Sequence, residues 1–532
     1  MRKLTPLLVA LLLLTVPDLA HAFCGFYVAG GTADLYNNAT QVVLMRDGTR
    51  TILSMQNNYE GPLEDFAMVV PVPVVLQQDM VHTLDKSVFD KVDQLSAPRL
   101  VEYFETDPCQ PDDYFGGNNG AGNNGGNNGG NNGGVVVEAE FKVGEYQIVI
   151  LSADEAGALT QWLTENDYNI PDGTEPTLAP YIDGGSYFFV ARVIAEEVAY
   201  ENGRALLSPL RFHYDDENFV LPIRLGLINA EDVQDVLVYI LARNQRYEVA
   251  NYDNVFIPTN IEVHNEVRGD FGNFYNALFD QTLAATPGAV VTEYAWNAGT
   301  CDPCPGPTLD PNDLATLGAD SIGDGESAAL DRNWVLTRLH ARYPAGTVGE
   351  DFVFRGVETA QGGRGFGADA HPGVTLGDGR NNFQGRYIIY HRFEDAIDCA
   401  EPIHSRFGWG GLDAAPSSNT TGDDFRTAGG DLSEYLAQDI TDINATANTP
   451  LDRGRAAGAN NGGNNGNNGN NGNNGNNGVN NGNNGASGNN GANNGDGGGS
   501  GGDDGCATVV AQTTPLGALL IVGFALWARR RR

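Results

Sequence analysis

The pattern of apolar and polar positions predicts β-strands joined by tight turns in the first third of the chain. The apolar segments 41–45 and 51–55 flank Asp47-Gly48, a dipeptide whose residues readily take the positive φ that a short hairpin turn needs. Apolar and charged side chains alternate over 137–143, which is typical of a half-buried strand, and the chain turns at Gly144-Glu145 into 146–151. We therefore expect antiparallel hairpins here.

Apolar residues at helical spacing predict a few helices among the strands. Val88, Phe89, Val92 and Leu95 share one face of a short helix. A longer helical face is formed by Phe271, Phe274, Tyr275, Leu278 and Phe279. An aromatic ligand groove is an alternative interpretation of that second face, but a helix packed on a sheet accounts better for this spacing.

Further apolar segments complete the predicted fold class. Strands are expected at 187–194, 206–214, 219–225, 236–241, 334–342, 352–357 and 386–393. The polar cluster 215–218 indicates another hairpin, and Pro71 and Pro73 confine the segment 66–76 to a sheet edge or an extended connection. The sequence predicts an α+β, β-rich fold with mostly antiparallel sheets and a few packed amphipathic helices.

Residues 1–22 have the order of a secretory signal peptide. Arg2 and Lys3 form a basic start, 7–14 are mainly apolar, and Ala20-His21-Ala22 is a small-x-small cleavage site, so we expect cleavage after Ala22. A lipoprotein signal is a weaker alternative, because Phe23 stands before Cys24 where a small residue is needed. The sequence thus predicts export.

The segment 507–528 is predicted to be a transmembrane helix. At ~1.5 Å per residue it is about 33 Å long, enough to span a bilayer. The cluster Arg529–Arg532 follows at once and is expected on the cytoplasmic side. Gly505-Cys506, the apolar segment and the arginines together resemble the MYXO-CTERM sorting tail of myxobacteria and their relatives. The resemblance implies processing near Cys506 by a sorting protease and delivery to the cell surface.

Two tracts of Asn-Asn-Gly repeats divide the exported chain. Residues 116–134 and 460–505 have almost no apolar side chains to bury, so we expect both tracts to be disordered. The first is expected to be an insertion in a β-rich globular region, 23–300. A Gly/Pro-rich second region covers 301–459. The second tract is expected to be a stalk of roughly 35–40 Å root-mean-square length before the tail at 506–532.

The charge balance excludes one class of partner. With 31 Lys+Arg against 68 Asp+Glu, the net charge of −37 is a poor basis for binding nucleic-acid phosphates. Arg2, Lys3 and Arg529–Arg532 lie in the terminal segments, so the exported part is still more acidic.

The cysteines are candidates for disulfides, because export places them in an oxidising compartment. Apart from Cys506 in the tail, they are Cys24, Cys109, Cys301, Cys304 and Cys399. At most two bridges can form among these five, with one thiol remaining or pairing with Cys506. The spacing leaves the connectivity open.

Cys301-Asp302-Pro303-Cys304 has the CxxC spacing of thiol–disulfide exchange proteins. Pro305 and Pro307 are unfavourable for the helix that such a site uses. No second CxxC supports a zinc site. Structural disulfides are therefore favoured over redox activity and over metal binding.

Calcium is the one cofactor with any support in the sequence. Asp320, Asp324 and Asp331 approach the spacing of a calcium loop, but Ile322 occupies its third position, so a solvated acidic loop is favoured. The histidines are scattered without an HExxH pair, and no residue is identified as catalytic.

Five strings in order resemble the exported bacterial family "domain of unknown function 2330". They are 23–28 (FCGFYV), 65–73 (DFAMVVPVP), 207–212 (LSPLRF), 221–226 (LPIRLG) and 301–305 (CDPCP). The resemblance covers 23–400 and implies an exported, β-rich module with no established activity, so it transfers no catalytic residue.

The sequence favours a non-enzymatic binding or structural module, anchored at the surface through a flexible stalk. The expected partners are the envelope membrane, a sorting protease and a protein or glycan ligand, and the expected location is the cell envelope. The alternative is an exported hydrolase that uses Asp/Glu acid–base catalysis, which needs only two carboxylates close in space.

Overall fold

The computed structural model describes residues 26–437 except for gaps at 31–35, 38–39, 57–58, 61–66, 110–138, 154–155, 167, 171–173, 202–203, 230–232, 324, 345–348, 366–372, 378, 410–416 and 419–429. These residues all belong to the first of two compact units, Met1–Asn460. The predicted signal, both Asn/Gly tracts and the apolar segment 507–528 lie outside the described residues. Among the helices that are described, none has the length and apolarity to cross a membrane.

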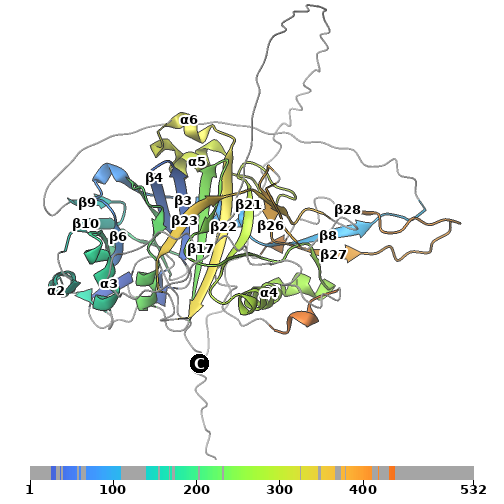
Figure 1. The fold of residues 1–532 in the computed structure, drawn as a ribbon, viewed down its shortest axis with the longest axis horizontal. Coiled ribbons are helices and arrows are strands. Elements are labelled where there is room, and N and C mark those ends of the chain that lie inside the picture. Colours follow the sequence, from blue (N-terminus) through green and yellow to red (C-terminus); the bar gives the residue numbers. More distant parts are fainter. Residues whose placement is uncertain are drawn as a thin grey trace, which may run out of the picture. The chain divides into compact units, whose positions relative to one another are not determined.

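An 11-stranded sheet, here called the main sheet, is the centre of the fold (Figure 1). Its order is β25 (Thr375–Leu376), β24 (Ala360–Gly362), β26 (Asn382–Gln384), β21 (Val290–Asn297), β22 (Trp334–Pro344), β17 (Val233–Arg243), β3 (Thr40–Asp47), β4 (Arg50–Gln56), β15 (Leu210–Asp215) and β7 (Val81–Thr83), with β19 (Asn254–Phe256) beside β21. Val238 of β17 faces one core and Tyr239 the other, because successive side chains of a strand point to opposite faces. Both faces of the main sheet are therefore covered.

A second sheet of six strands packs on one face of the main sheet. Its order is β11 (Tyr168–Asn169), β1 (Phe26–Gly30), β6 (Ala67–Val72), β12 (Tyr187–Val193), β10 (Tyr146–Leu151) and β9 (Ala139–Val143). Val70 and Phe189 meet Leu44 of the main sheet in one apolar core. Helices α2 (Ala156–Glu165) and α3 (Thr174–Asp183) cover the outer face through Leu159 and Leu178.

Helices α1 (Ser87–Ser96) and α4 (Phe271–Ala285) cover the opposite face of the main sheet. The two short helices α5 (Pro311–Leu317) and α6 (Glu326–Ala329) contribute to the same core. The apolar faces predicted for α1 and α4 are confirmed, since every residue named for them is buried. The layers thus follow the order helices, main sheet, second sheet, helices. With six α-helices in the described residues and mostly antiparallel strands, the fold is α+β and β-rich, as predicted.

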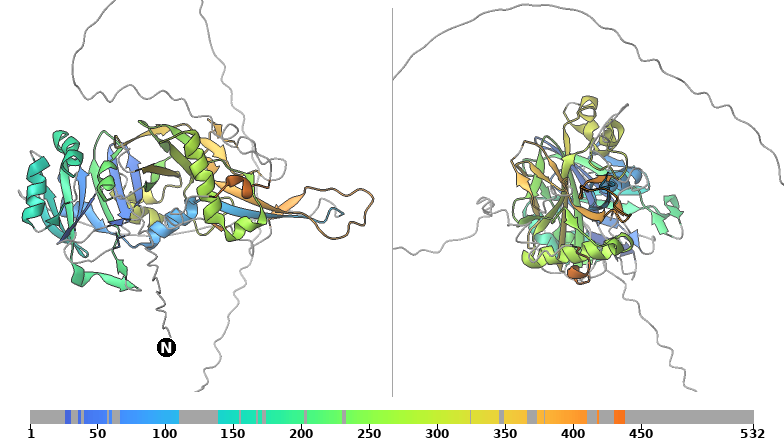
Figure 2. Two further views of the ribbon diagram at one scale, coloured as in Figure 1. Left: turned by 90° about the horizontal axis from the view of Figure 1, so that it is seen from below. Right: turned by 90° about the vertical axis from the view of Figure 1, so that its right-hand side faces the viewer.

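A small sheet extends away from the main sheet (Figures 1 and 2). Here β8 (Arg99–Glu105) lies between β27 (Arg386–His391), which runs parallel to it, and β28 (Phe407–Trp409), with β20 (Ile261–Glu262) beside β27 and β29 (Ser417–Ser418) beside β8. Val101, Tyr103 and Ile388 form its own small core. We call the segments 99–109 and 386–409 the arm.

The remaining described strands form small sheets. These are β16 (Val220–Leu221), β23 (Phe352–Val357) and β18 (Arg246–Val249) in one sheet, and the pairs β13 (Ala199–Glu201) with β14 (Arg204–Leu206) and β2 (Tyr36–Asn37) with β5 (Tyr59–Glu60). The prediction of a hairpin at 215–218 is wrong. The strands on either side of it are not described as a pair, because β15 pairs with β4 and β7 whereas β16 pairs with β23.

The first predicted hairpin is present with a shifted turn. β3 and β4 pair from Gln41–Gln56 to Asp47–Arg50, so the two turn residues are Gly48 and Thr49. Gly48 has φ +57°, and the glycine therefore carries the left-handed conformation. Asp47 belongs to the strand.

Pro71 lies in an inner strand, whereas its segment was predicted to be a sheet edge or an extended connection. β6 sits between β1 and β12, and Pro71 pairs with Phe188 of β12. The pairing described with β1 ends at Val69, so at Pro71 the strand has a single described partner, as an edge position does.

Strands from both sides of residue 300 share the main sheet. β22, from the predicted second region, lies between β17 and β21 of the first. The predicted boundary between 23–300 and 301–459 therefore does not coincide with a boundary between sheets.

Candidate functional site

Two disulfides join four of the candidate cysteines. Cys109 bonds to Cys399 with a Cα–Cα distance of 5.7 Å, and Cys301 bonds to Cys304 with a Cα–Cα distance of 4.9 Å. Cys24 and the predicted processing residue Cys506 lie outside the described residues, as does the predicted cleavage residue Ala22. The prediction of disulfides is confirmed, and the structure supplies the pairing that spacing left open.

The two bridges differ in what they contribute to stability. Cys109 and Cys399 are 290 residues apart, whereas Cys301 and Cys304 are 3 apart. In the loop-entropy description the long loop stabilises by roughly 5–6 kcal/mol and the short ring by about 2 kcal/mol. The first bridge therefore constrains the unfolded chain far more than the second and contributes more to stability.

The Cys109–Cys399 bridge fastens an exposed loop of the arm, 394–405, to the segment that follows β8. At the two ends of the loop, the backbone N–H of Phe393 and of Ser405 donate to the Glu105 carboxylate at 2.9 and 2.6 Å. These bonds lower the pKa of Glu105 below its ordinary value. Ile403 N–H also donates to Pro108 O at 3.0 Å. The loop is thus held at both ends and in its middle.

Exposed apolar side chains gather on this loop. Ile397 and Ile403 are 41% and 52% exposed, on either side of Cys399, and Phe104 of β8 is 41% exposed. Phe104 stacks on His391 with a ring distance of 4.3 Å. Four exposed carboxylates lie among them, at Glu394, Asp395, Asp398 and Glu401. We call loop 394–405 together with Phe104 the arm surface.

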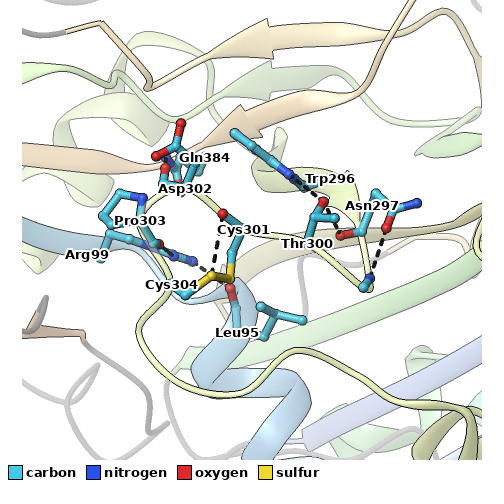
Figure 3. Close-up of a disulfide and its surroundings, with 11 residues drawn as sticks. Leu95, Arg99, Trp296, Asn297, Thr300, Cys301, Asp302, Pro303, Cys304 and Gln384 are labelled. Atoms are coloured by element: carbon cyan, nitrogen blue, oxygen red, sulfur yellow. Dashed lines mark hydrogen bonds between the residues drawn. A yellow bond between two sulfur atoms is a disulfide. The ribbon is translucent and has the colours of Figure 1, made fainter. Parts of the chain in front are cut away.

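The Cys301–Cys304 loop rests on side chains from two neighbouring elements (Figure 3). Arg99 donates to Pro303 O at 2.8 Å, and Gln384 donates to Asp302 O at 2.5 Å. Asp302 also forms an ion pair with Arg364 at 3.0 Å. Both carbonyls between the cysteines are therefore held by buried side chains.

Arg99 is a buried cation beside this loop. It is fully buried, and within the described part of the chain it makes no ion pair with a carboxylate and its Nε has no hydrogen-bond partner. Burial lowers the pKa of Arg99 to about 10, and the neighbouring Arg386 and Arg338 act in the same direction. The guanidinium nevertheless stays charged at neutral pH.

The calcium candidates are engaged with arginines. Asp320 pairs with Arg211 at 3.1 Å, and Asp331 pairs with Arg243 at 3.5 Å. Asp324 lies outside the described residues. In the ranges that the structure describes, no three His, Cys, Asp or Glu side chains gather as a metal site would require.

A network of buried charges lies between the main sheet and helices α1 and α4. Its centre is Arg338 of β22, which donates to Asp93 of α1 and, at 2.5 Å, to Glu293 of β21. Tyr239 donates to Asp93 at 2.6 Å, and Tyr275 donates to Glu293. Arg338 and Glu293 are fully buried.

The network continues through His340 towards the surface. His340 contacts Glu293 through Nδ1 at 2.8 Å and Asp235 through Nε2 at 2.9 Å. Arg342 then links Asp235, at 2.8 Å, to Asp280, at 2.6 Å. Asp280 is 42% exposed, so only this end reaches solvent.

A β-bulge places Glu293 between its two basic partners. In the pairing of β21 with β22, Thr292 faces Leu339 and Tyr294 faces Arg338, so Glu293 is the extra residue. A bulge redirects the side chain of the inserted residue, which here lies between Arg338 and His340.

The network shifts the pKa values of its members in different directions. Burial opposes ionisation of Glu293, but His340 and Arg338 prevail and lower its pKa to about 2. Burial raises the pKa of Asp93 in spite of Arg338. His340 is also desolvated, yet Glu293 and Asp235 raise its pKa above the ordinary value. Two carboxylates with opposed pKa shifts are characteristic of acid–base sites, but these are enclosed by protein on every side.

Sequence reasoning missed both the network and the arm surface. Arg338, His340 and Arg342 alternate with Leu339 and Ala341, a pattern that usually indicates a strand with one face in solvent. The pattern was a usable signal, but nothing in it indicated that α1 and α4 would cover the polar face.

Comparison with known proteins identifies the family of this chain. The family model described as "uncharacterized protein conserved in bacteria (DUF2330)" matches residues 18–355. The search of curated proteins and the search of solved structures found no match. Since the family model covers more than half of the sequence, the chain belongs to the bacterial family DUF2330.

Proposed function

We propose that this protein is an exported, surface-anchored binding module without enzymatic activity, held on a flexible stalk, and that it binds a protein ligand through the arm surface. The targeting part of the proposal rests on the signal-like residues 1–22, the tract 460–505 and the apolar segment 507–528. The binding part rests on the arm.

The observation that carries the binding proposal is the combination of exposure and constraint in loop 394–405. Ile397 and Ile403 stay in solvent, although most large apolar side chains of the fold are buried. The disulfide and the Glu105 carboxylate hold the loop that carries them. A constrained loop loses little conformational freedom on binding, so its apolar contacts contribute more fully to affinity.

The charge of the arm surface selects the kind of ligand. The exposed carboxylates of Glu394, Asp395, Asp398 and Glu401 lie on the same loop as the two isoleucines. A complementary ligand would present lysine or arginine around an apolar patch, because opposite potentials favour encounter and correct register. A basic protein surface meets both requirements.

A pull-down from bacterial envelopes tests the proposal, with residues 23–459 as bait in the presence and absence of calcium. We expect the bait to retain a basic protein, and the double variant Ile397→Ser/Ile403→Ser to lose retention about tenfold or more, as for a contact worth more than ~1.4 kcal/mol. Leu330→Ser is the matched control, since Leu330 is equally exposed at 52% but lies outside the arm.

Three outcomes would count against the proposal. If the double variant retained the same protein, binding would not depend on the arm surface. Retention from envelopes first digested with protease would indicate a glycan ligand. If the bait retained no ligand either with or without calcium, the binding proposal would lose its support.

A further inference from the structure

We propose that Cys301–Cys304 is a reversible thiol–disulfide pair that exchanges with an external dithiol, with Cys304 as the sulfur that is attacked. Cys304 is exposed, whereas Cys301 is half-buried against the core beside α1. An attacking thiolate can therefore approach the Cys304 sulfur from solvent and leave Cys301 as the departing sulfur.

The loop geometry does not depend on the disulfide. Arg99 holds Pro303 O at 2.8 Å and Gln384 holds Asp302 O at 2.5 Å, so both carbonyls between the cysteines are fixed from the protein side (Figure 3). Thr300, just before the loop, accepts a bond from the Trp296 indole at 3.1 Å. Reduction removes none of these bonds. The two thiols therefore stay close enough to re-form the bridge.

The charges around the loop favour a thiolate. Arg99 is buried against the loop and has no carboxylate partner in the described residues, while the one acid within the loop, Asp302, is paired with Arg364. A nearby cation lowers the free energy of a thiolate and makes it a better leaving group. The departing Cys301 thiolate would form in this cationic environment.

The exchange balances as a two-electron transfer. A thiolate of the external dithiol attacks Cys304 Sγ, the Cys301–Cys304 S–S bond breaks, and Cys301 leaves as a thiolate. The second thiol of the donor then attacks the donor's first sulfur in the mixed disulfide, and Cys304 leaves as a thiolate. The donor loses two electrons and two protons and becomes a disulfide, and the two cysteines of this chain gain them.

Equilibration of the full chain with mixtures of reduced and oxidised dithiothreitol is the first test. Alkylation and peptide mass spectrometry then report each bridge separately. We expect the equilibrium constant for reducing Cys301–Cys304 to exceed that for Cys109–Cys399 at least about tenfold, with an unchanged circular dichroism spectrum. Reduction of Cys301–Cys304 only under conditions that also unfold the chain would overturn the proposal.

Single-cysteine variants identify the attacked sulfur. With oxidised glutathione as probe, Cys304 in the Cys301→Ser variant should form the mixed disulfide at least about tenfold faster than Cys301 in the Cys304→Ser variant, because only Cys304 is exposed. The reverse order would overturn the assignment.

A charge variant tests the part played by Arg99. Arg99→Met should lower the equilibrium constant for reduction about three- to tenfold, because the thiolates lose the neighbouring cation. Arg392→Met is the control, since Arg392 is exposed on the arm. An unchanged constant in a folded Arg99→Met variant would exclude this role, and if that variant does not fold, the single-cysteine comparison decides.

Discussion

His340 shows how an ionisable residue can be buried between two carboxylates. Its ring is fully buried, contacts carboxylates at both nitrogens, and stacks on Phe279 at a ring distance of 4.0 Å. The pKa of Glu293 is lowered to about 2, so a protonated His340 has an ionised carboxylate beside it throughout the ordinary pH range. Removing one member of such a buried pair typically costs ~3–5 kcal/mol, because the other charge is left without compensation.

The raised pKa of His340 predicts how stability depends on pH. The folded chain keeps a proton that the unfolded chain releases above a pH of about 6.5, so the stabilisation is complete below that pH and is lost as the pH rises through the folded pKa. We expect His340→Gln to lower the free energy of unfolding by roughly 3–5 kcal/mol at pH 6, and this difference to shrink at higher pH.

Urea unfolding at a series of pH values measures this effect. His264→Gln serves as control, because His264 is exposed. Parallel stability curves for wild type and His340→Gln would contradict the prediction.

At residue level the sequence predicted the apolar core far better than the charged one. Phe89 and Leu278 could be placed by their spacing, since apolar side chains are buried almost wherever an element allows it. Asp93 could not, because its spacing is also that of a solvent-facing position on α1. Its burial is favoured by partners far along the chain, Tyr239 and Arg338, the latter 245 residues away.

At the level of elements, local pairing was predictable and distant pairing was not. The β3–β4 and β9–β10 hairpins follow from adjacent patterns and turn residues. The arm depends on β8 and β27, which pair in parallel from Arg99–Arg386 to Phe104–His391. Nothing in either segment specifies a partner so far along the chain. The sequence predicted the strand at 386–393 but not β8.

The bridge in the arm should contribute more to the free energy of unfolding than the Cys301–Cys304 bridge. We expect Cys109→Ser/Cys399→Ser to lower the free energy of unfolding by up to roughly 5–6 kcal/mol and to make loop 394–405 sensitive to limited proteolysis, because the long loop closure is lost. Cys301→Ser/Cys304→Ser should cost about 2 kcal/mol or less. Urea unfolding of both variants tests this order, and a larger loss from the second variant would contradict it.

In the molecule as a whole, the layers depend on strands from distant parts of the chain. β22 lies between β17 and β21 and carries Arg338 and His340 into the buried network. The sequence predicted β17 and β22 but not β21, and the order of the three strands in the sheet is a property of the assembled fold that has no local signal.

This interleaving predicts that the first 300 residues do not fold alone. A chain of residues 23–300 lacks β22, so β17 and β21 lose their shared partner and Glu293 and Asp93 lose Arg338. We expect no cooperative thermal unfolding of this fragment, whereas a chain of residues 23–459 should unfold cooperatively. Calorimetry of the two fragments provides the comparison, and a sharp transition in the shorter one would be evidence against the prediction.

The parallel pairing of β8 with β27 also determines how long β8 stays unpaired during synthesis of the chain. The 290 residues between Cys109 and Cys399 take roughly 15–60 s to synthesise at ~5–20 residues per second. Throughout that interval the newly made β8 has neither of its neighbouring strands, and an unpaired strand edge is a template for association with other chains. During its own synthesis, the nascent protein therefore depends on whatever shields that edge until the last quarter of the chain arrives.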